Sequence, residues 1–186
     1  MHLICGAPSE LPAGSVERLG RYRHQVFIEN LGWALASDHG CERDRFDRAD
    51  TVYVAVEDAQ ARIAGCARLL PTLQPYLLKE VFPELLHGAP PPCDARIWEL
   101  SRFASMDFSQ PVSTPLAQFS ASSTALLLRG AMDCAARRGA ERLITVSPVG
   151  IERLIRRLGI RASQAGPPLS IHGQRMFACW IELAEP

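Results

Sequence analysis

Four stretches of the chain place apolar side chains three or four residues apart, a spacing typical of helices: residues 15–31, 77–86, 114–138 and 151–158. Glycine follows the first, third and fourth stretches, and the third begins with Thr-Pro, so these boundaries resemble ordinary helix ends. The second is short and broken by Pro83. The fourth has the most regular pattern, with apolar side chains on one face and three arginines on the other.

Strands are predicted by short runs rich in β-branched and other apolar residues. These runs are residues 2–5, 51–57, 62–70, 96–104, 143–147 and 175–183. The turn sequence DAQA joins the second and third runs, which predicts a hairpin. Residues 33–50 are polar, charged and aperiodic, and we expect a long loop of the kind that often carries function. The order of elements predicts an α/β (α+β) fold, a mixed twisted sheet with helices on both faces, as a single domain over residues 1–186.

Composition excludes several classes of protein. The chain is 47% hydrophobic and carries 20 basic and 20 acidic side chains, so it lacks the basic surplus expected for general nucleic-acid binding. No run approaches the ~18 apolar residues of a membrane span, and no basic leader precedes an apolar core at the N-terminus. The six cysteines are at least 25 residues apart, which excludes zinc-ribbon spacing. We expect a soluble cytoplasmic protein with reduced thiols and no bound metal.

The neutral total conceals an uneven distribution of charge. Residues 129–161 contain eight arginines and three acids, whereas residues 1–128 contain eleven basic and fifteen acidic side chains. The basic stretch is either a solvated helix face or a docking patch for an acidic partner. Nineteen of the basic residues are arginine, and only Lys79 is lysine. Codon usage in a GC-rich genome explains such a bias, as does a need for bidentate contacts with anions.

Two clusters of polar and aromatic residues precede the second predicted strand. In the first, Arg23 and Phe27 share one side of the predicted helix, and Trp33 follows. These residues either pack in the core or close over a cationic or planar ligand. The second contains Glu42, Asp44 and Asp47 between arginines, without the spacing of a calcium-binding loop. Internal ion pairing and recognition of a cationic small molecule both fit it.

The third cluster lies on the predicted strand over residues 96–104. Strand alternation places Glu99 and Ser101 on one face and Arg102 on the other, with Trp98 and Leu100. Opposite charges inside an apolar strand are costly unless they are paired. With Arg68 on the neighbouring strand, these residues either form an ion-pair network or line a cleft.

Taken together, these residues form an ordered set of motifs. The set comprises Arg23, Phe27 and Trp33, then Asp44 and Asp47, then GCARLLPT at 65–72 with Arg68, and WELSRF at 98–103. In order and spacing, from about Tyr22 to Gly159, the chain resembles the LuxI-type acyl-homoserine lactone synthases. It matches that family at the family's charged positions.

The resemblance implies a fold related to the GNAT acyltransferases and a two-substrate reaction. Such enzymes take an acyl chain from acyl carrier protein, and S-adenosylmethionine is a substrate rather than a cofactor. The α-amine attacks the thioester, and the methionine carboxylate then attacks its own γ-carbon, closes the lactone and expels methylthioadenosine. The product is a quorum-sensing signal.

The resemblance also suggests roles for individual residues. We expect the general base to be Glu99, acting through a water with Ser101 and beside Arg102. The S-adenosylmethionine side and its lid would contain Arg23, Phe27, Trp33, Asp44, Asp47, Arg68 and Phe103. It is equally consistent with the pattern that the charged members order the N-terminal lid by pairing with one another.

Acyl recognition is expected farther along the chain. The resemblance places the acyl pocket along residues 143–147 and the helix that follows, with Thr145, Ser147, Ile151 and Met132 as walls. A Thr145 hydroxyl can hydrogen-bond a C3 oxygen, which favours a 3-oxo or 3-hydroxy chain of medium length. An ordinary strand threonine is the alternative. Acidic acyl carrier protein would dock on Arg153, Arg156 and Arg157.

Two other functions stay open at this point. One is a GNAT-like N-acyltransferase that uses acyl-CoA and another amine. The other is a non-catalytic module that binds a ligand or a partner.

Overall fold

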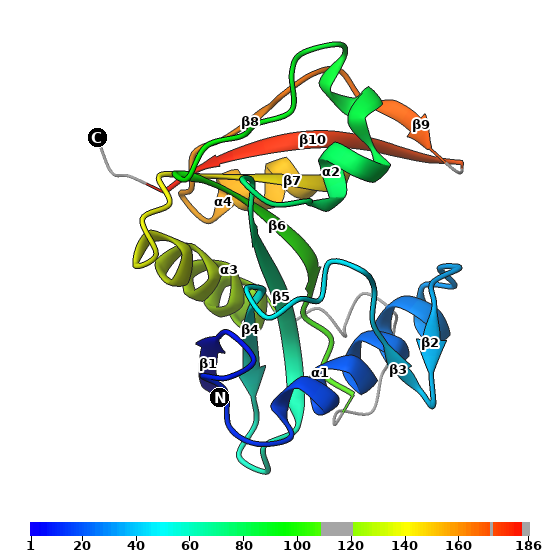
Figure 1. Ribbon diagram of the computed structural model, residues 1–186, viewed down its shortest axis with the longest axis vertical. Coiled ribbons are helices and arrows are strands. Elements are labelled where there is room, and N and C mark those ends of the chain that lie inside the picture. Colours follow the sequence, from blue (N-terminus) through cyan, green and yellow to red (C-terminus); the bar gives the residue numbers. More distant parts are fainter. Residues whose placement is uncertain (109–120, 172, 184–186) are drawn as a thin grey trace. The chain divides into compact units, whose positions relative to one another are not determined.

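The computed structural model describes residues 1–108, 121–171 and 173–183 (Figure 1). Its helices are α1 (Ser15–Arg23), the π-helix η1 (His24–Asn30), α2 (Leu77–Val81), the 3₁₀-helix η2 (Pro83–Leu86), α3 (Ala121–Ala136) and α4 (Ile151–Arg157). Its strands are β1 (His2–Gly6), β2 (Ser37–Asp38), β3 (Cys41–Glu42), β4 (Val52–Glu57), β5 (Ile63–Pro71), β6 (Ile97–Ala104), β7 (Arg142–Pro148), β8 (Ala162–Gln164), β9 (Leu169–Ile171) and β10 (Gln174–Glu182).

The chain divides into two compact units. The first comprises Met1–Arg68 and Arg102–Cys134, and the second comprises Leu69–Ser101 and Ala135–Pro186. Strands β5 and β6 contribute residues to both.

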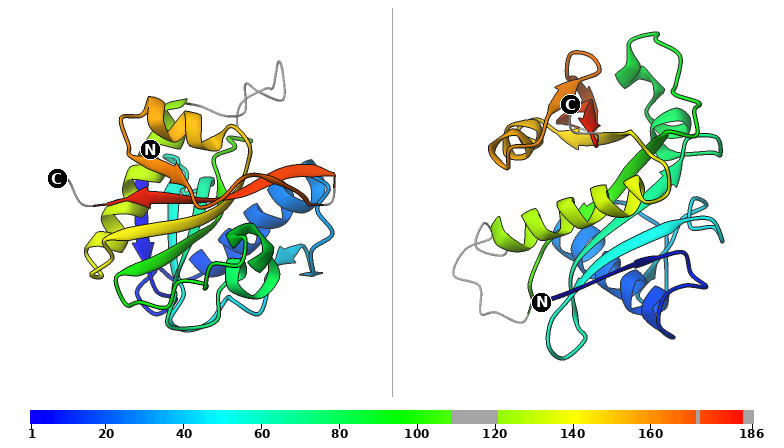
Figure 2. Two further views of the ribbon diagram at one scale, coloured as in Figure 1. Left: turned by 90° about the horizontal axis from the view of Figure 1, so that it is seen from above. Right: turned by 90° about the vertical axis from the view of Figure 1, so that its left-hand side faces the viewer.

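The first unit is a sheet covered by helices on both faces. Strand β1 pairs antiparallel with β4, and the strand order continues through β5 to β6. Leu19, Tyr22 and Val26 of α1 and η1 pack in one buried cluster with Tyr53 and other residues of the same sheet face. The opposite face meets α3 (Figure 2). Gly130 of α3 approaches Leu3 of β1 so closely that an added Cβ would lie 2.1 Å from the Leu3 Cδ1 atom. A larger residue at position 130 would therefore require the Leu3 side chain to move.

The second unit contains both kinds of strand pair. Strand β6 runs parallel to β7 from the Ile97–Arg142 pair to the Leu100–Thr145 pair. Strand β7 is antiparallel to β10, which also pairs with β8 and β9. The predicted mixed sheet with flanking helices is therefore confirmed.

Most predicted elements are present, but some segments differ from their prediction. The helix predicted over residues 15–31 begins as expected but continues from His24 as a π-helix, a rare form that is frequent at functional sites. The predicted loop over residues 33–50 contains the small β2–β3 hairpin. The predicted helix start at Thr114-Pro115 lies outside the described residues.

Three general properties complete the description. None of the helices in the described ranges is both long and apolar enough to cross a membrane. No cysteine forms a disulfide. Among the described residues, no group of three or more His, Cys, Asp or Glu side chains is arranged to hold a metal ion.

Candidate active site

Six charged side chains of the first unit form a closed ring in which guanidinium and carboxylate groups alternate. We call it the charge ring, and its members in order are Arg23, Glu42, Arg102, Asp44, Arg68 and Asp47. They come from α1, β3, the segment after β3, β5 and β6. Five of these residues belong to the predicted site. The structure brings all five together.

Each link of the charge ring is a short ion pair. Asp47 holds the Arg23 guanidinium through two parallel hydrogen bonds of 2.7 and 2.9 Å. Arg68 Nη1 lies 2.6 Å from Asp44 Oδ1 and 3.1 Å from Asp47 Oδ1. Arg102 Nη2 lies 3.0 Å from Glu42 Oε1 and 2.9 Å from Asp44 Oδ2. The Nε of Arg23 closes the ring on Glu42.

The charge ring is almost entirely buried. The Asp44 side chain is 20% exposed, whereas no other member exceeds 6%. Burial alone would raise the pKa of Asp47, but the hydrogen bonds and charge of Arg23 and the charge of Arg68 hold it well below its ordinary value. The Tyr53 hydroxyl donates a further hydrogen bond of 2.9 Å to Asp47 Oδ1. Internal pairing, one of the two readings of this sequence cluster, is therefore present.

The carboxylates also fold their own segment. Asp44 Oδ1 accepts the Phe46 N–H at 2.8 Å, and Asp47 Oδ2 accepts the Asp44 N–H at 2.8 Å. Such side-chain-to-backbone bonds are typical of aspartates in turns. The spacing of the two aspartates therefore serves the local turn and the charge ring together.

An aromatic pair lies against the charge ring. The rings of Phe27 and Trp33 stack with centroids 5.0 Å apart, and the backbone N–H of Trp33 donates to the backbone carbonyl of Phe27 at 2.8 Å. The guanidinium carbon of Arg102 lies 5.6 Å from the Phe27 centroid. Phe27 is 2% exposed and Trp33 is half-buried. The pair thus joins core packing with an aromatic surface of the kind that attracts cations.

The backbone of β6 departs from regular strand geometry at Arg102. Its φ angle is 50°, in the left-handed region, so the regular strand geometry assumed for its side chain does not hold there. Phe103, which follows, is half-buried.

Glu99 belongs to the second unit and has a different environment from the one expected. It is fully buried, and its carboxylate oxygens accept the backbone N–H groups of Leu77 and Leu78 at 2.9 and 2.6 Å. It thereby satisfies donors at the N-terminus of α2 that no helical carbonyl reaches. The sequence predicted that Glu99 belongs to an ion-pair network or lines a cleft, and neither prediction included hydrogen bonds from backbone N–H groups. Ser101 is also buried.

The predicted acyl-pocket residues lie in different parts of the chain. Thr145 and Ser147 are buried on one face of β7, with their hydroxyl oxygens 3.5 Å apart. Thr145 pairs in register with Leu100, so it projects from the sheet face opposite to that of Glu99. Ile151 begins α4 and is half-buried, and Met132 lies on α3 in the first unit.

The three arginines of α4 are exposed, as their predicted docking role requires. Arg156 is engaged, because it pairs with Glu152 at 2.6 Å and donates to the Ala162 carbonyl at 3.0 Å. Arg153 and Arg157 are four residues apart on the same short helix.

Comparison with known proteins decides the family. The model of the autoinducer synthase family matches residues 9–185. The chain belongs to the autoinducer synthase family. It is 48% identical over 183 residues to the acyl-homoserine-lactone synthase of Acinetobacter nosocomialis, covering 98% of this chain and 100% of that protein. It is also 48% identical to the acyl-homoserine-lactone synthase of Ralstonia solanacearum over 93% of this chain and 84% of that one.

A solved structure agrees with this membership. The crystal structure of TofI in a ternary complex with an inhibitor and MTA matches with a TM-score of 0.84 and 47% identity, over 98% of this chain and 92% of that chain. The GNAT-like fold is thereby confirmed. As a family member, the chain is an acyltransferase that makes a quorum-sensing autoinducer.

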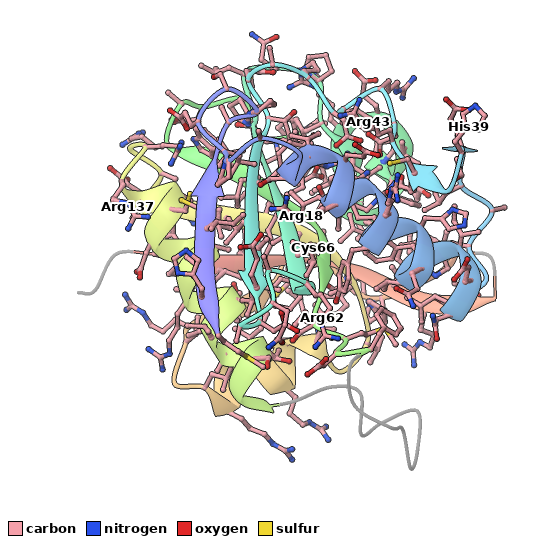
Figure 3. The ribbon with its side chains drawn as sticks, turned by 90° about the horizontal axis from the view of Figure 1, so that it is seen from below. Arg18, His39, Arg43, Arg62, Cys66 and Arg137 are labelled. Atoms are coloured by element: carbon pink, nitrogen blue, oxygen red, sulfur yellow. The ribbon has the colours of Figure 1, made fainter. Side chains whose placement is uncertain are left out.

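Two residues of this candidate site were missing from the sequence prediction. Glu42 was recognised as part of an acidic cluster but not as a site residue, whereas Tyr53 carried no polar signal because it fits an apolar strand pattern. Two surface pockets of the first unit, of about 460 and 320 Å³, contain none of the predicted site residues. Arg43 belongs to the larger pocket and Arg18 and Arg62 to the smaller (Figure 3).

Proposed function

We propose that the chain transfers an acyl group from acyl carrier protein to the α-amine of S-adenosylmethionine and then closes the lactone. In the first step an amide C–N bond forms, the thioester C–S bond breaks, and the carrier leaves as a thiol with the amine's proton. In the second, the methionine carboxylate displaces the sulfonium from the γ-carbon, and methylthioadenosine leaves as a neutral thioether. The observation that carries the proposal is the charge ring with its stacked aromatic pair in a member of this family.

The charges of S-adenosylmethionine suit this part of the molecule. Phe27 is buried beneath Arg102, so the half-buried Trp33 ring of the stacked pair offers the π surface to the sulfonium. Asp44 is the ring carboxylate that solvent reaches, so it can contact the ammonium group without breaking a fully buried pair. Arg23 and Arg68 are held by carboxylates, and we assign them to ordering the segment that carries Asp44.

A base must remove a proton from the ammonium group before the amine can attack. We propose Glu99 for this role, acting through a water with Ser101. The same carboxylate anchors α2, so a substitution there is informative only when stability is measured as well.

The acyl chain is proposed to be medium in length and oxidised at C3, as a 3-oxo or 3-hydroxy group. Support comes from the two adjacent buried hydroxyls of Thr145 and Ser147. Their polar atoms can hydrogen-bond a C3 oxygen, which an apolar wall would leave unsatisfied. Ile151, in the same unit, is the proposed apolar wall.

Acyl carrier protein is the proposed donor because it is acidic and α4 presents Arg153 and Arg157 to solvent. Acyl-CoA is the second candidate, since MesI, described as a CoA-dependent acyl-homoserine lactone synthase, is 27% identical with a TM-score of 0.81. The double variant Arg153→Glu/Arg157→Glu separates them. If acyl carrier protein docks on these arginines, the variant should have a higher KM for acyl carrier protein, and that KM should depend less on salt. The KM for acyl-CoA should be the same in the variant and in wild type. Arg62→Glu, a reversal at an exposed arginine just before β5, is the control.

The product itself tests the function. Purified enzyme with S-adenosylmethionine and a series of acyl donors should release methylthioadenosine and yield an acyl-homoserine lactone by mass spectrometry, whose mass gives chain length and C3 oxidation. An N-acylated product without methylthioadenosine would identify another N-acyltransferase. Absence of turnover with every donor would favour a binding module.

A further inference from the structure

Arg102 adopts a backbone conformation that its surroundings must stabilise. Its φ of 50° lies in the left-handed region, which the Cβ atom makes unfavourable. In the described part of the chain, three other non-glycine residues have positive φ: His39 and Ala61 in hairpin turns, and His87 after η2. Arg102 alone among these four lies inside a strand.

This conformation determines what the Arg102 side chain reaches. Its guanidinium bonds Glu42 and Asp44 and lies over the Phe27 ring, so it connects the charge ring to the aromatic pair. A return to ordinary strand geometry would redirect the side chain and break that connection.

The Cys66 thiol supports the Arg102 backbone directly. Its Sγ lies 3.2 Å from the Arg102 carbonyl oxygen and donates to it from β5. Cys66 is 1% exposed and lies among the strands of the first unit, whereas Arg43 and His39 lie at its periphery (Figure 3). Burial, the largest effect, raises the pKa of this thiol to about 12, although the nearby Arg23, Arg102 and Arg68 oppose the shift. The thiol therefore stays protonated and remains a donor.

We propose that Cys66 is a positioning residue: its S–H group holds the Arg102 backbone in the left-handed conformation and so keeps the guanidinium between the charge ring and Phe27. Cys66 contacts no substrate in this scheme and acts through Arg102. The effect on catalysis rests on the proposed binding of S-adenosylmethionine beside the aromatic pair.

The test compares Cys66→Ala with Cys66→Ser. Alanine removes the donor, whereas serine keeps one. With saturating acyl donor, Cys66→Ala should raise KM for S-adenosylmethionine about twofold to fivefold, the range expected for the loss of one weak S–H···O hydrogen bond. kcat and KM for the acyl donor should change less than about twofold in that variant. Cys66→Ser should stay close to wild type. Cys134→Ala, which truncates another fully buried cysteine of the first unit, should also leave KM for S-adenosylmethionine unchanged.

Two kinetic results would overturn the proposal. One is an unchanged KM for S-adenosylmethionine in Cys66→Ala, and the other is equal defects in the alanine and serine variants. A crystal structure of Cys66→Ala gives a readout independent of activity, because Arg102 should leave the left-handed region. Retention of positive φ there refutes the positioning role even if the proposed function holds. A wild-type enzyme that makes no lactone refutes the function instead.

Discussion

Asp47→Asn is the substitution whose effect can be worked out most fully. The amide keeps one acceptor oxygen and turns the other position into a donor that faces guanidinium groups. In the wild-type protein the Asp47 carboxylate accepts hydrogen bonds from both terminal nitrogens of Arg23, from one nitrogen of Arg68 and from the Tyr53 hydroxyl. The variant would leave the neutral charge ring with one uncompensated positive charge, at side chains that are 1–3% exposed.

The size of the effect follows from burial. Removing one partner of a buried ion pair destabilises a protein by about 3–5 kcal/mol. At about 2–4 °C per kcal/mol for a chain of this length, Tm should fall by roughly 6–20 °C. Because the folded-state pKa of Asp47 lies below its unfolded value, its contribution is complete above the unfolded pKa and is lost as pH falls through the folded pKa. The difference in Tm between wild type and Asp47→Asn should therefore become smaller below about pH 4.

Thermal unfolding of the wild-type protein and of Asp47→Asn between pH 3 and pH 8 measures the loss of Tm and its dependence on pH. The matched control is Glu17→Gln, which breaks the exposed pair of Glu17 with Arg21 and should shift Tm by no more than about 2 °C. Equal shifts in the two variants at pH 7, or a difference that does not narrow in acid, would refute the reasoning.

Three other substitutions test separate parts of the molecule. Glu99→Gln should lower kcat about 100-fold if Glu99 is the base, and near wild-type turnover in the folded variant would exclude that role. Thr145→Val should shift the products toward chains without a C3 oxygen in mass spectra, and an unchanged product spectrum would contradict the proposed contact. Gly130→Ala should lower the free energy of unfolding by about 1–3 kcal/mol in urea titrations, with partial recovery when Leu3→Ala is added, because the new Cβ collides with the Leu3 side chain.

The periodic patterns predicted the elements well because burial of one face dominates their energetics. They failed where a local feature depends on contacts made elsewhere. The π-helix over His24–Asn30 and the left-handed Arg102 have no signature in the spacing of apolar residues. The β2–β3 hairpin has strands of two residues each, too short for alternation to be visible.

The charged residues show the same limit at the level of the site. The residue types and their order were sufficient to recognise the family. Ion pairing among the charged residues was one of two interpretations of the predicted loop over residues 33–50. The specific links could not be read, because Arg102 reaches Glu42 across 60 positions of sequence. Glu99 was expected to need a charged partner or a cleft, yet backbone N–H groups of Leu77 and Leu78 satisfy it, and backbone donors are the same in every sequence.

A closed ring of alternating charges also determines which amino-acid substitutions the protein tolerates. Every member has two neighbours of opposite sign, so a single reversal creates two repulsive contacts. A second reversal at either neighbour repairs one of them but creates another. In a mutational scan all six positions should therefore behave as one intolerant block. Loss of signal output at any of them will report failed folding before it reports failed chemistry, and only variants shown to be folded can reveal which of the six touches a substrate.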